Sequence, residues 1–412
     1  MSTRSRVVGA VRAATGIVPD AVLARLMPRG LRWDQTQMRV AHAPSTPVRL
    51  LIAPTNSAGQ AYRWARAVES SLSTVGAVNL MTTNARTARF SFPADVEVPD
   101  SGYLFAHGWQ KRQREAIVGE FTHVLIESGR YVHGPVPWKS PTSAALDLAA
   151  RGVGIGLLWH GSDIRVPSEH AAWEADSPFG PRGHYPTEAT AVLEANAIDR
   201  GRMITDTDLP VFVSTPGLLS VPRARWLPVV VDPSYWRAPE PPLSAGVPVV
   251  AYVPSNSPMK GDSSIDIQLE SLESEGLIRY RRLEGVPASE MPDVYRSADI
   301  VLDQFRLGDY GVAACEAMAA GRVVIGHVHD EVRARVVDLT GRDLPIVEAR
   351  YDGVGEKVRE ILDDPEPWIA LAKTGISFVD EIHDGRLSAT QLSDFLGIAV
   401  DTSSSLQEGR DD

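Results

Sequence analysis

From Val48 onward, short runs rich in β-branched and apolar residues alternate with segments that carry a helical pattern. This alternation is typical of parallel sheets covered by helices, because one parallel strand reaches the next only through a crossover connection. In the first half it predicts strands over residues 48–53, 76–81, 103–106, 123–127, 153–159 and 209–215, and helices over 59–71, 110–119 and 143–151. In the second half it predicts strands over 247–253, 278–283, 299–305 and 323–328, and helices from 262 or 263 to 276, over 289–296 and over 312–320. Both halves are therefore expected to be doubly wound α/β units.

A proline-rich stretch without an apolar period, residues 233–246, separates the two halves and is the expected hinge. The chain is then predicted to contain a basic N-terminal extension (1–46), a Rossmann-like domain (47–232), the linker (233–246), a second Rossmann-like domain (247–364), a helical segment (365–397) and a polar tail (398–412). The helical segment could pack on either domain. If the two domains face each other across a cleft, ligands are expected in that cleft, at the carboxyl ends of the parallel strands.

The charge balance excludes one class of partner. Lys and Arg number 41 and Asp and Glu number 52 in 412 residues, which gives a formal net charge of −11. A general nucleic-acid binder needs a basic footprint instead. The single cysteine, Cys315, cannot form an internal disulfide, which fits a reducing cytoplasm. No stretch has the roughly 20 predominantly apolar residues of a spanning helix. From the charge, the lone cysteine and the lack of such a stretch, we expect a cytoplasmic protein that binds no nucleic acid.

The N-terminus differs from the rest of the chain in charge. Residues 1–33 hold six arginines and one acid, Asp20, with apolar residues between them. No unbroken apolar core of signal-peptide length follows these charges. Two interpretations stay open. The segment contacts an anionic membrane from its inner face as a peripheral element, or it is a helix or frayed extension packed on the first domain.

The stretch from Ala298 to Gly326 carries the clearest chemical signal. It combines a buried strand, a loop with Gly308 and Gly311, and a helix with Glu316 near its start. Glycines let a diphosphate approach the backbone, N–H groups at a helix start attract its charge, and a carboxylate one turn in can accept both hydroxyls of a ribose. The pattern predicts a nucleotide site, although a single glutamate at such a position can also be an ordinary exposed helix acid.

The same residues resemble a known family. GDYG at 308–311 and EAMAAG at 316–321 are similar to the signature of retaining glycosyltransferases of the GT-B fold, in particular glycosyltransferase family 4. The resemblance is strong over residues 247–330, moderate over 153–232 and weak before that. It implies an enzyme, independent of metal and cofactor, that moves a sugar from a nucleoside-diphosphate sugar to a glycan, lipid or small-molecule acceptor. The second domain would hold the donor and the first would present the acceptor. A sugar-nucleotide hydrolase or epimerase of the same fold, or a non-catalytic sugar-nucleotide-binding homologue, are the alternatives.

Within the family motif, the glutamate that binds the donor ribose matches Glu316. A second family glutamate, which contacts the donor sugar, corresponds to Gly308 in this chain. That contact would then come from the side chain of Asp309, or from backbone amides of the loop 308–312, which also contains Tyr310, Gly311 and Val312.

The pair Lys260–Gly261 follows the first predicted strand of the second domain. It resembles the family element whose lysine neutralises the donor pyrophosphate. The family arginine a few residues upstream is absent, and Ser255 and Asn256 offer hydrogen bonds without charge. The resemblance therefore implies one cation at the diphosphate, or help from elsewhere, such as Arg165.

The segment HGSDIR at 160–165 is similar to the family's His-Gly-x-Asp segment, whose histidine lies near the donor sugar. The match assigns that role to His160, followed by Gly161. Asp163 and Arg165 would orient the histidine or bind acceptor. The implied catalytic residues are His160, Glu316 and Lys260.

Two weaker candidates for the acceptor region are His107, which is also followed by glycine, and Gly59, which opens the first predicted helix. Asp206 and Asp208 form a DTD triplet, the spacing with which other glycosyltransferases chelate a metal-bound diphosphate. Such triplets arise by chance in a chain with 52 acids, so we interpret this one as a surface turn and predict no metal. Cys315 is expected to fill the core rather than act as a nucleophile.

Overall fold

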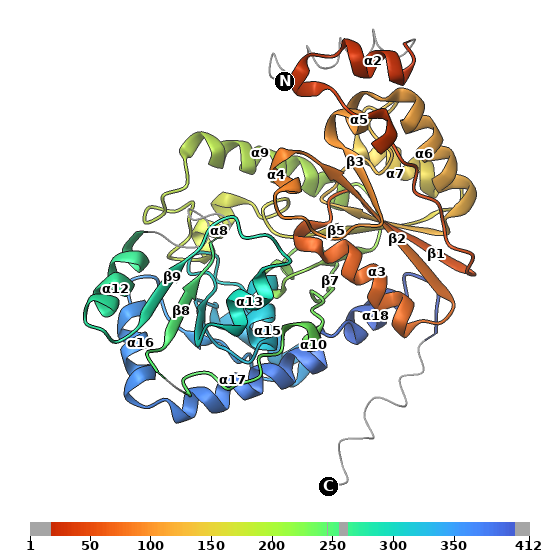
Figure 1. The fold of residues 1–412 in the computed structure, drawn as a ribbon. Helices are drawn as coiled ribbons and strands as arrows, with labels where there is room; N and C mark the ends of the chain where they lie inside the picture. Colours follow the sequence, from red (N-terminus) through yellow and green to blue (C-terminus); the bar gives the residue numbers. More distant parts are fainter. Residues whose placement is uncertain (1–17, 245, 255–262, 400–412) are drawn as a thin grey trace.

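The computed structural model describes residues 18–244, 246–254 and 263–399. They form two parallel sheets, and helices cover both faces of each sheet (Figure 1). The expected α/β fold is confirmed.

The N-terminal sheet has seven strands in the order β3-β2-β1-β4-β5-β6-β7. Their bounds are β1 (Val48–Ala53), β2 (Val75–Thr83), β3 (Val96–Pro99), β4 (His123–Glu127), β5 (Gly154–Trp159), β6 (Val211–Val213) and β7 (Ala224–Trp226). In the interior of the sheet, Leu51 of β1 is in register with Val78 of β2 and Val124 of β4. Leu50 and Leu51 belong to hydrophobic clusters on opposite faces. Because both faces are buried, this strand is a continuous apolar run in the sequence.

Helices from distant parts of the chain cover this sheet. α3 (Gln60–Ser71) and α18 (Arg386–Ser393) pack on the face that holds Leu50. The opposite face is covered by α6 (His107–Glu120), α7 (Pro141–Ala149) and α9 (Thr187–Thr205). The shorter helices of this half are α2 (Asp20–Leu26), α4 (Ala85–Ala88), α5 (Asp100–Phe105) and α8 (Pro167–Trp173), with 3-10 turns η1 (Arg29–Leu31), η2 (Gln35–Gln37), η3 (Ser57–Gly59) and η4 (Pro216–Leu218).

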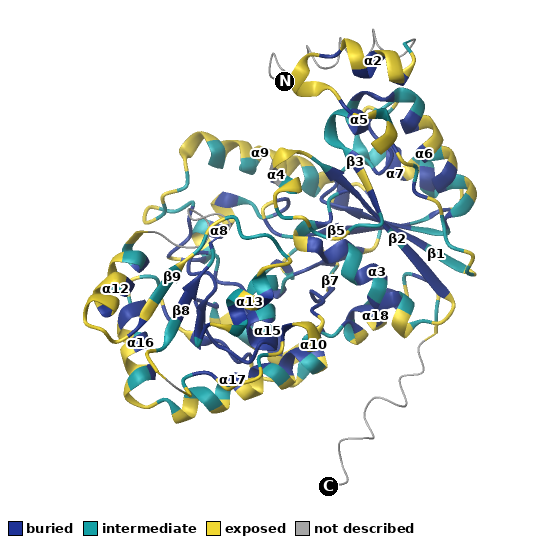
Figure 2. Ribbon diagram, viewed as in Figure 1, coloured by how far each residue is buried: buried dark blue, intermediate teal, exposed yellow. Residues whose placement is uncertain are grey.

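The C-terminal sheet has five strands in the order β12-β11-β10-β8-β9. They are β8 (Val249–Tyr252), β9 (Arg279–Arg282), β10 (Ile300–Leu302), β11 (Val323–Gly326) and β12 (Val347–Glu348). α12 (Ser263–Ser274) and α16 (Val354–Asp363) cover one face. The other face is covered by α14 (Val312–Ala319), α15 (Asp330–Thr340) and α17 (Glu366–Phe378). The short α10 (Pro233–Trp236) and α13 (Met291–Arg296) complete this half. In Figure 2 the strands of both sheets are largely buried and the outer sides of the helices are exposed.

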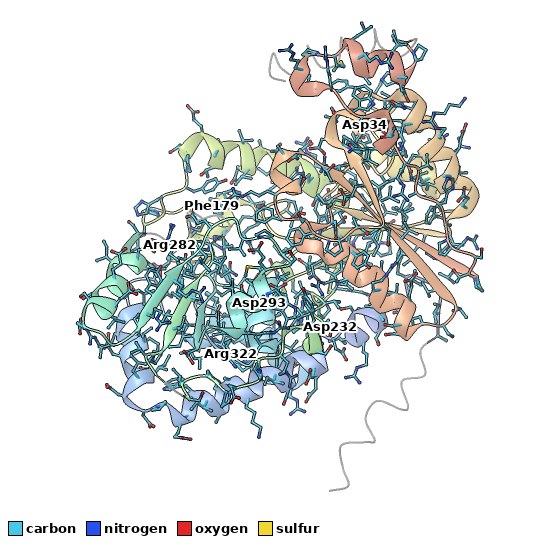
Figure 3. All side chains as sticks on the ribbon, in the orientation of Figure 1. Asp34, Phe179, Asp232, Arg282, Asp293 and Arg322 are labelled. Carbon is cyan, nitrogen blue, oxygen red and sulfur yellow. The ribbon has the colours of Figure 1, made fainter. Side chains whose placement is uncertain are left out.

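The linker and the C-terminal segment tie the two halves together. Part of the expected linker is helical, since α10 buries Trp236 in the C-terminal core. Arg322, labelled in Figure 3, donates to the carbonyls of Ala298 and Glu240 and so fixes the linker to the C-terminal sheet. The π-helix η5 (Val379–His383) joins α17 on one sheet to α18 on the other. The segment therefore packs on both halves.

Two sequence expectations differ from the structure. Residues 103–106 were expected as a strand but lie largely in α5. A short apolar run fits both states, and Pro99, with its fixed φ, stands directly before the helix. The sequence pattern also missed the helices α9, α15 and α16 and the short strands β3, β7 and β12. The longest of these strands has four residues. Within the residues that the structure describes, no helix has the length and apolar character needed to cross a bilayer.

Candidate functional site

A cavity of about 280 Å³ lies between the carboxyl-end loops of the two sheets. It joins three residues that the sequence analysis singled out, Gly59, Val312 and Glu316. The rest of its described lining comes from both halves: Ala58, Arg63, Phe90, Phe92, Pro93, Trp236, Val253, Pro254, Gly285, Val286, Ala288, Met291, Tyr295 and Ala313. Most of these side chains are apolar. Among the described lining residues, Arg63 carries the one positive charge and Glu316 the one negative charge.

Glu316 is placed by the packing of α14. The small residues Ala314, Cys315 and Ala317 on this helix are fully buried in the C-terminal core. This leaves the partly exposed Glu316 on the side that lines the cavity, next to Val312. Cys315 therefore fills the core, as expected, and burial raises the pKa of its thiol.

Gly308 has a role that the sequence did not predict. Its backbone is left-handed, with φ +60°, and a Cβ there would lie 2.8 Å from Oε2 of Glu174. Glu174 comes from the N-terminal half, directly after α8, and is almost fully buried. A carboxylate from the other half thus occupies the space beside Gly308, where the resemblance implies that a glutamate side chain is missing.

Glu174 remains charged in this position. Burial opposes its charge, but hydrogen bonds from His327 and from the amide of Asp176, with the charge of Arg350 nearby, lower its pKa to about 2. His327 Nε2 lies 2.8 Å from Oε2 of Glu174. Neither Glu174 nor His327 was singled out from the sequence. The one signal available was that His327 directly follows a buried strand.

Asp309, Tyr310 and Arg165 are not among the residues that line this cavity. Asp309 Oδ2 lies 3.4 Å from an Arg165 nitrogen, and Asp309 Oδ1 accepts the amide of Tyr310 at 2.9 Å. Burial raises the pKa of Asp309, while the charge of Arg165 acts in the opposite direction. Tyr310 is also buried, and its hydroxyl lies 3.4 Å from Nε2 of His383. Arg165 lines a different cavity, of about 270 Å³, beside α8 and α15.

His160 stands at the carboxyl end of β5 and contacts Glu127 at the end of β4. The distance from Nε2 to Oε1 is 3.1 Å, and the imidazole stacks on Trp64 with ring centroids 5.8 Å apart. Burial disfavours the imidazolium, but the hydrogen bond and charge of Glu127, with Asp163 nearby, raise the pKa of His160. Glu127 is the residue that sequence reasoning missed here, although it ends a predicted strand at the edge where ligands are expected.

Backbone amides fix the positions of His160 and of its partner Glu127. Asp163 accepts the amides of His160 and Gly161 at 3.0 and 2.8 Å, so Asp163 orients the turn that follows β5. The second oxygen of Glu127 accepts the amides of Thr55 and Asn56, each at 2.8 Å. Glu127 therefore links His160 to the loop that leads to Gly59 at the cavity.

The remaining candidates lie elsewhere. His107 begins α6, where Asp20 accepts the next two amides, and it does not line the cavity with Glu316. Asp208 is fully exposed and pairs with Arg223, which agrees with a surface turn. No group of three or more potential ligand side chains is arranged for a metal ion in the described part of the chain, and metal independence stays a prediction. Four donor candidates, Ser255, Asn256, Lys260 and Gly261, lie outside the described residues.

Comparison with known proteins identifies the fold. No protein-family model matches the chain, and no curated protein matches it. Solved structures do match. HepE from Anabaena in complex with UDP-glucose is 12% identical, with 84% of this chain and 98% of that chain covered and a TM-score of 0.54. An α-glucosyltransferase in complex with UDP and a DNA 13-mer is 8% identical, with 84% and 98% covered and a TM-score of 0.53. Sucrose-phosphate synthase from Thermosynechococcus elongatus is 13% identical, with 84% and 97% covered and a TM-score of 0.50.

The chain has the GT-B fold. In this GT-B protein, the cavity with Glu316 lies where the carboxyl edges of the two sheets approach each other. Beside it, Phe90 of the first half accepts a hydrogen bond at 3.1 Å from the amide of Ala288 of the second. The GT-B halves therefore meet directly at one rim of the cavity.

Proposed function

We propose that the protein is a glycosyltransferase that moves a sugar from a nucleoside-diphosphate sugar to an acceptor. The observation that carries this proposal is the cavity between the halves of the GT-B fold, lined by both Glu316 and Arg63. Two of the solved structures with the same fold contain UDP or UDP-glucose. A cavity that offers a carboxylate, a guanidinium and apolar surface suits a ligand that combines ribose, diphosphate and base.

The donor nucleotide would lie against the C-terminal half. Glu316, one turn into α14, would accept hydrogen bonds from the ribose hydroxyls. Val253, Pro254 and Val286 provide the apolar surface of the same cavity, against which a planar base can lie. This arrangement agrees with the role that the sequence resemblance implies for Glu316.

Arg63 would supply positive charge for the diphosphate. It extends from α3 of the N-terminal half into the cavity, and no ion pair joins it to a described acidic side chain. Arg165 is less suited to this role, since it is paired with Asp309 and lines the other cavity. A guanidinium binds phosphate oxygens through two parallel hydrogen bonds. We therefore assign the diphosphate contact to Arg63, together with Lys260.

For the chemical step we propose transfer with retention and without a metal. The rate would then depend on stabilising the negative charge that grows on the departing diphosphate. Arg63 and Lys260 would contact that charge, and His160, kept protonated to higher pH by Glu127, would contact the donor sugar. Approach of the two halves would exclude water from the reacting atoms. The acceptor would be presented by the N-terminal half.

Two assays test the proposed function. A thermal-shift screen of nucleoside diphosphates and their sugars should raise the melting temperature with one nucleotide class, because a ligand that binds only the folded state stabilises it. Product analysis with the stabilising donor should then show sugar transfer that depends on an added acceptor. Rapid turnover of donor alone would indicate a hydrolase or epimerase. Binding without any transfer across an acceptor panel would indicate a non-catalytic sugar-nucleotide-binding protein.

A further inference from the structure

Residues 18–32, which we call the N-terminal segment, cover the outer end of the first half. Figure 1 shows α2 beside α5 and α6, far from the C-terminal sheet. One side of the segment is anchored: Leu23, Ala24 and Met27 are buried in the core of the first half. The carboxylate of Asp20 accepts the amides of Gly108 and Trp109 at 2.9 and 2.7 Å, at the start of α6. The segment is thus held in one orientation on the protein.

The other side of the segment exposes large apolar side chains. Val22 is 47% exposed, Leu26 71% and Leu31 41%. Single exposed apolar residues are common on protein surfaces, whereas a group of them marks an interaction site. These three lie within ten residues of one another in the chain, and Figure 2 shows this side of α2 as exposed.

The exposed part of the segment is also positively charged. Arg25, Arg29 and Arg32 are all exposed. The one acid of the segment, Asp20, is buried against α6 and so contributes no charge to this side. The next acid along the chain, Asp34, follows the segment and is exposed. In a chain with a net charge of −11, the folding of this segment therefore produces a local surface that is cationic and apolar together.

We infer that the N-terminal segment docks on an anionic membrane surface. Leu26, Leu31 and Val22 would enter the boundary between headgroups and acyl chains, while the arginines would contact lipid phosphates. This combination distinguishes a lipid surface from other polyanions, since a nucleic acid would use the arginines and leave the leucines in water. A contact this small gives reversible binding that weakens with salt, because exposed charges are screened.

Co-sedimentation of the purified full chain with vesicles tests this inference. We expect binding to vesicles of phosphatidylcholine mixed with phosphatidylglycerol, and much weaker binding to phosphatidylcholine alone. The variant Arg25→Gln/Arg29→Gln should lose about 25-fold in partitioning, since each arginine near an anionic surface contributes roughly fivefold. Leu26→Ser should lose severalfold with the charge unchanged. Arg32 is left intact because its Nε donates to the carbonyl of Met27 and supports the turn.

Matched controls distinguish binding through the N-terminal segment from nonspecific adsorption to the vesicles. Val192→Ser and Arg202→Gln change an exposed apolar and an exposed charged residue of α9, and both should bind like the unmodified protein. Equal melting temperatures would establish that all variants are folded. Three outcomes would overturn the inference: no binding to the anionic vesicles, equal binding to both vesicle types, or binding that the segment variants leave unchanged. The last result would assign the contact to another part of the chain, such as residues 1–17. None of these measurements depends on the proposed transferase activity.

Discussion

The carboxylate of Glu174 lies 2.8 Å from the position that a Cβ at Gly308 would occupy. The two residues belong to different halves of the GT-B fold, and Glu174 is also bonded to His327. At position 308, where the sequence resemblance implies a glutamate, the chain has a glycine, and a buried carboxylate from the other half lies beside it. The bond between Glu174 and His327 links the N-terminal half to the segment that follows β11.

Substitution of Gly308 should destabilise the protein. In Gly308→Ala, the left-handed backbone and the contact with Glu174 should together cost about 1–3 kcal/mol of the free energy of unfolding. Gly311→Ala is the matched control, because its backbone is extended and a Cβ there meets no atom within 4 Å. Chemical denaturation of both variants measures the difference. Equal stabilities would contradict the assigned packing.

The His327 contacts predict a pH dependence. Its ring lies between Glu174 and Glu348, which are also paired with Arg350 and Arg333 respectively. Burial opposes the charge, but hydrogen bonds to the two carboxylates raise the pKa of His327 to about 9. Because the folded pKa exceeds the unfolded value of roughly 6.5, the charged ring stabilises the fold fully below that pH, and this contribution is lost as pH rises through about 9.

We expect the free energy of unfolding to fall by up to about 3 kcal/mol over this window relative to His327→Gln, whose side chain does not titrate. Urea unfolding at a series of pH values provides the measurement. A difference between the two proteins that stays constant with pH would argue that His327 is neutral in the folded state.

Glu127 should control the protonation of His160. In Glu127→Gln the amide keeps a hydrogen-bond acceptor but loses the charge, so the pKa of His160 should fall. NMR titration of the ring protons detects this shift. Glu120→Gln, whose carboxylate contacts the exposed His42 instead, should leave the His160 resonance unaffected. If His160 contacts the donor sugar, Glu127→Gln should also lower turnover more than donor affinity.

Arg63 should matter for the diphosphate and not for the nucleoside. Arg63→Ala is expected to weaken binding of the nucleoside diphosphate about tenfold, through loss of charged hydrogen bonds, with nucleoside binding unchanged. Lys111→Ala removes an exposed charge from α6 of the same half and should change neither. Calorimetric titration compares the two ligands. Equal loss for both would reassign Arg63 to general packing of the cavity.

The sequence predicted the fold best for strands that are buried on both faces. β1 and β4 lie at the predicted residues because both of their faces are covered, which imposes an uninterrupted apolar run. The edge strands β3 and β12 have one neighbour each and only four and two residues, so their pattern is too short to recognise. The apolar run at 103–106 fitted a strand as well as the helix α5 that it forms.

The site was only partly accessible, because its contacts join residues far apart in the chain. Glu316 could be singled out since the strand, the glycine loop and the helix that position it are consecutive. The pairing of Arg165 with Asp309 spans 144 residues, and no local pattern indicates this pairing or the place of Arg165 in a cavity other than the one that Glu316 lines. Arg63 occupies an ordinary helix position, and only the approach of the two halves places it in the cavity.

The central claim is that the cavity holds the nucleotide of a sugar donor through Glu316. Calorimetric titration of the unmodified protein and of Glu316→Ala, with the nucleoside diphosphate that stabilises the protein most, tests it directly. The exposed Glu356→Ala on α16 serves as the control. We expect a loss of about 1.5–3 kcal/mol, or 10- to 100-fold in affinity, for Glu316→Ala alone. Unchanged affinity in Glu316→Ala, or no nucleotide binding by the unmodified protein, would contradict the account.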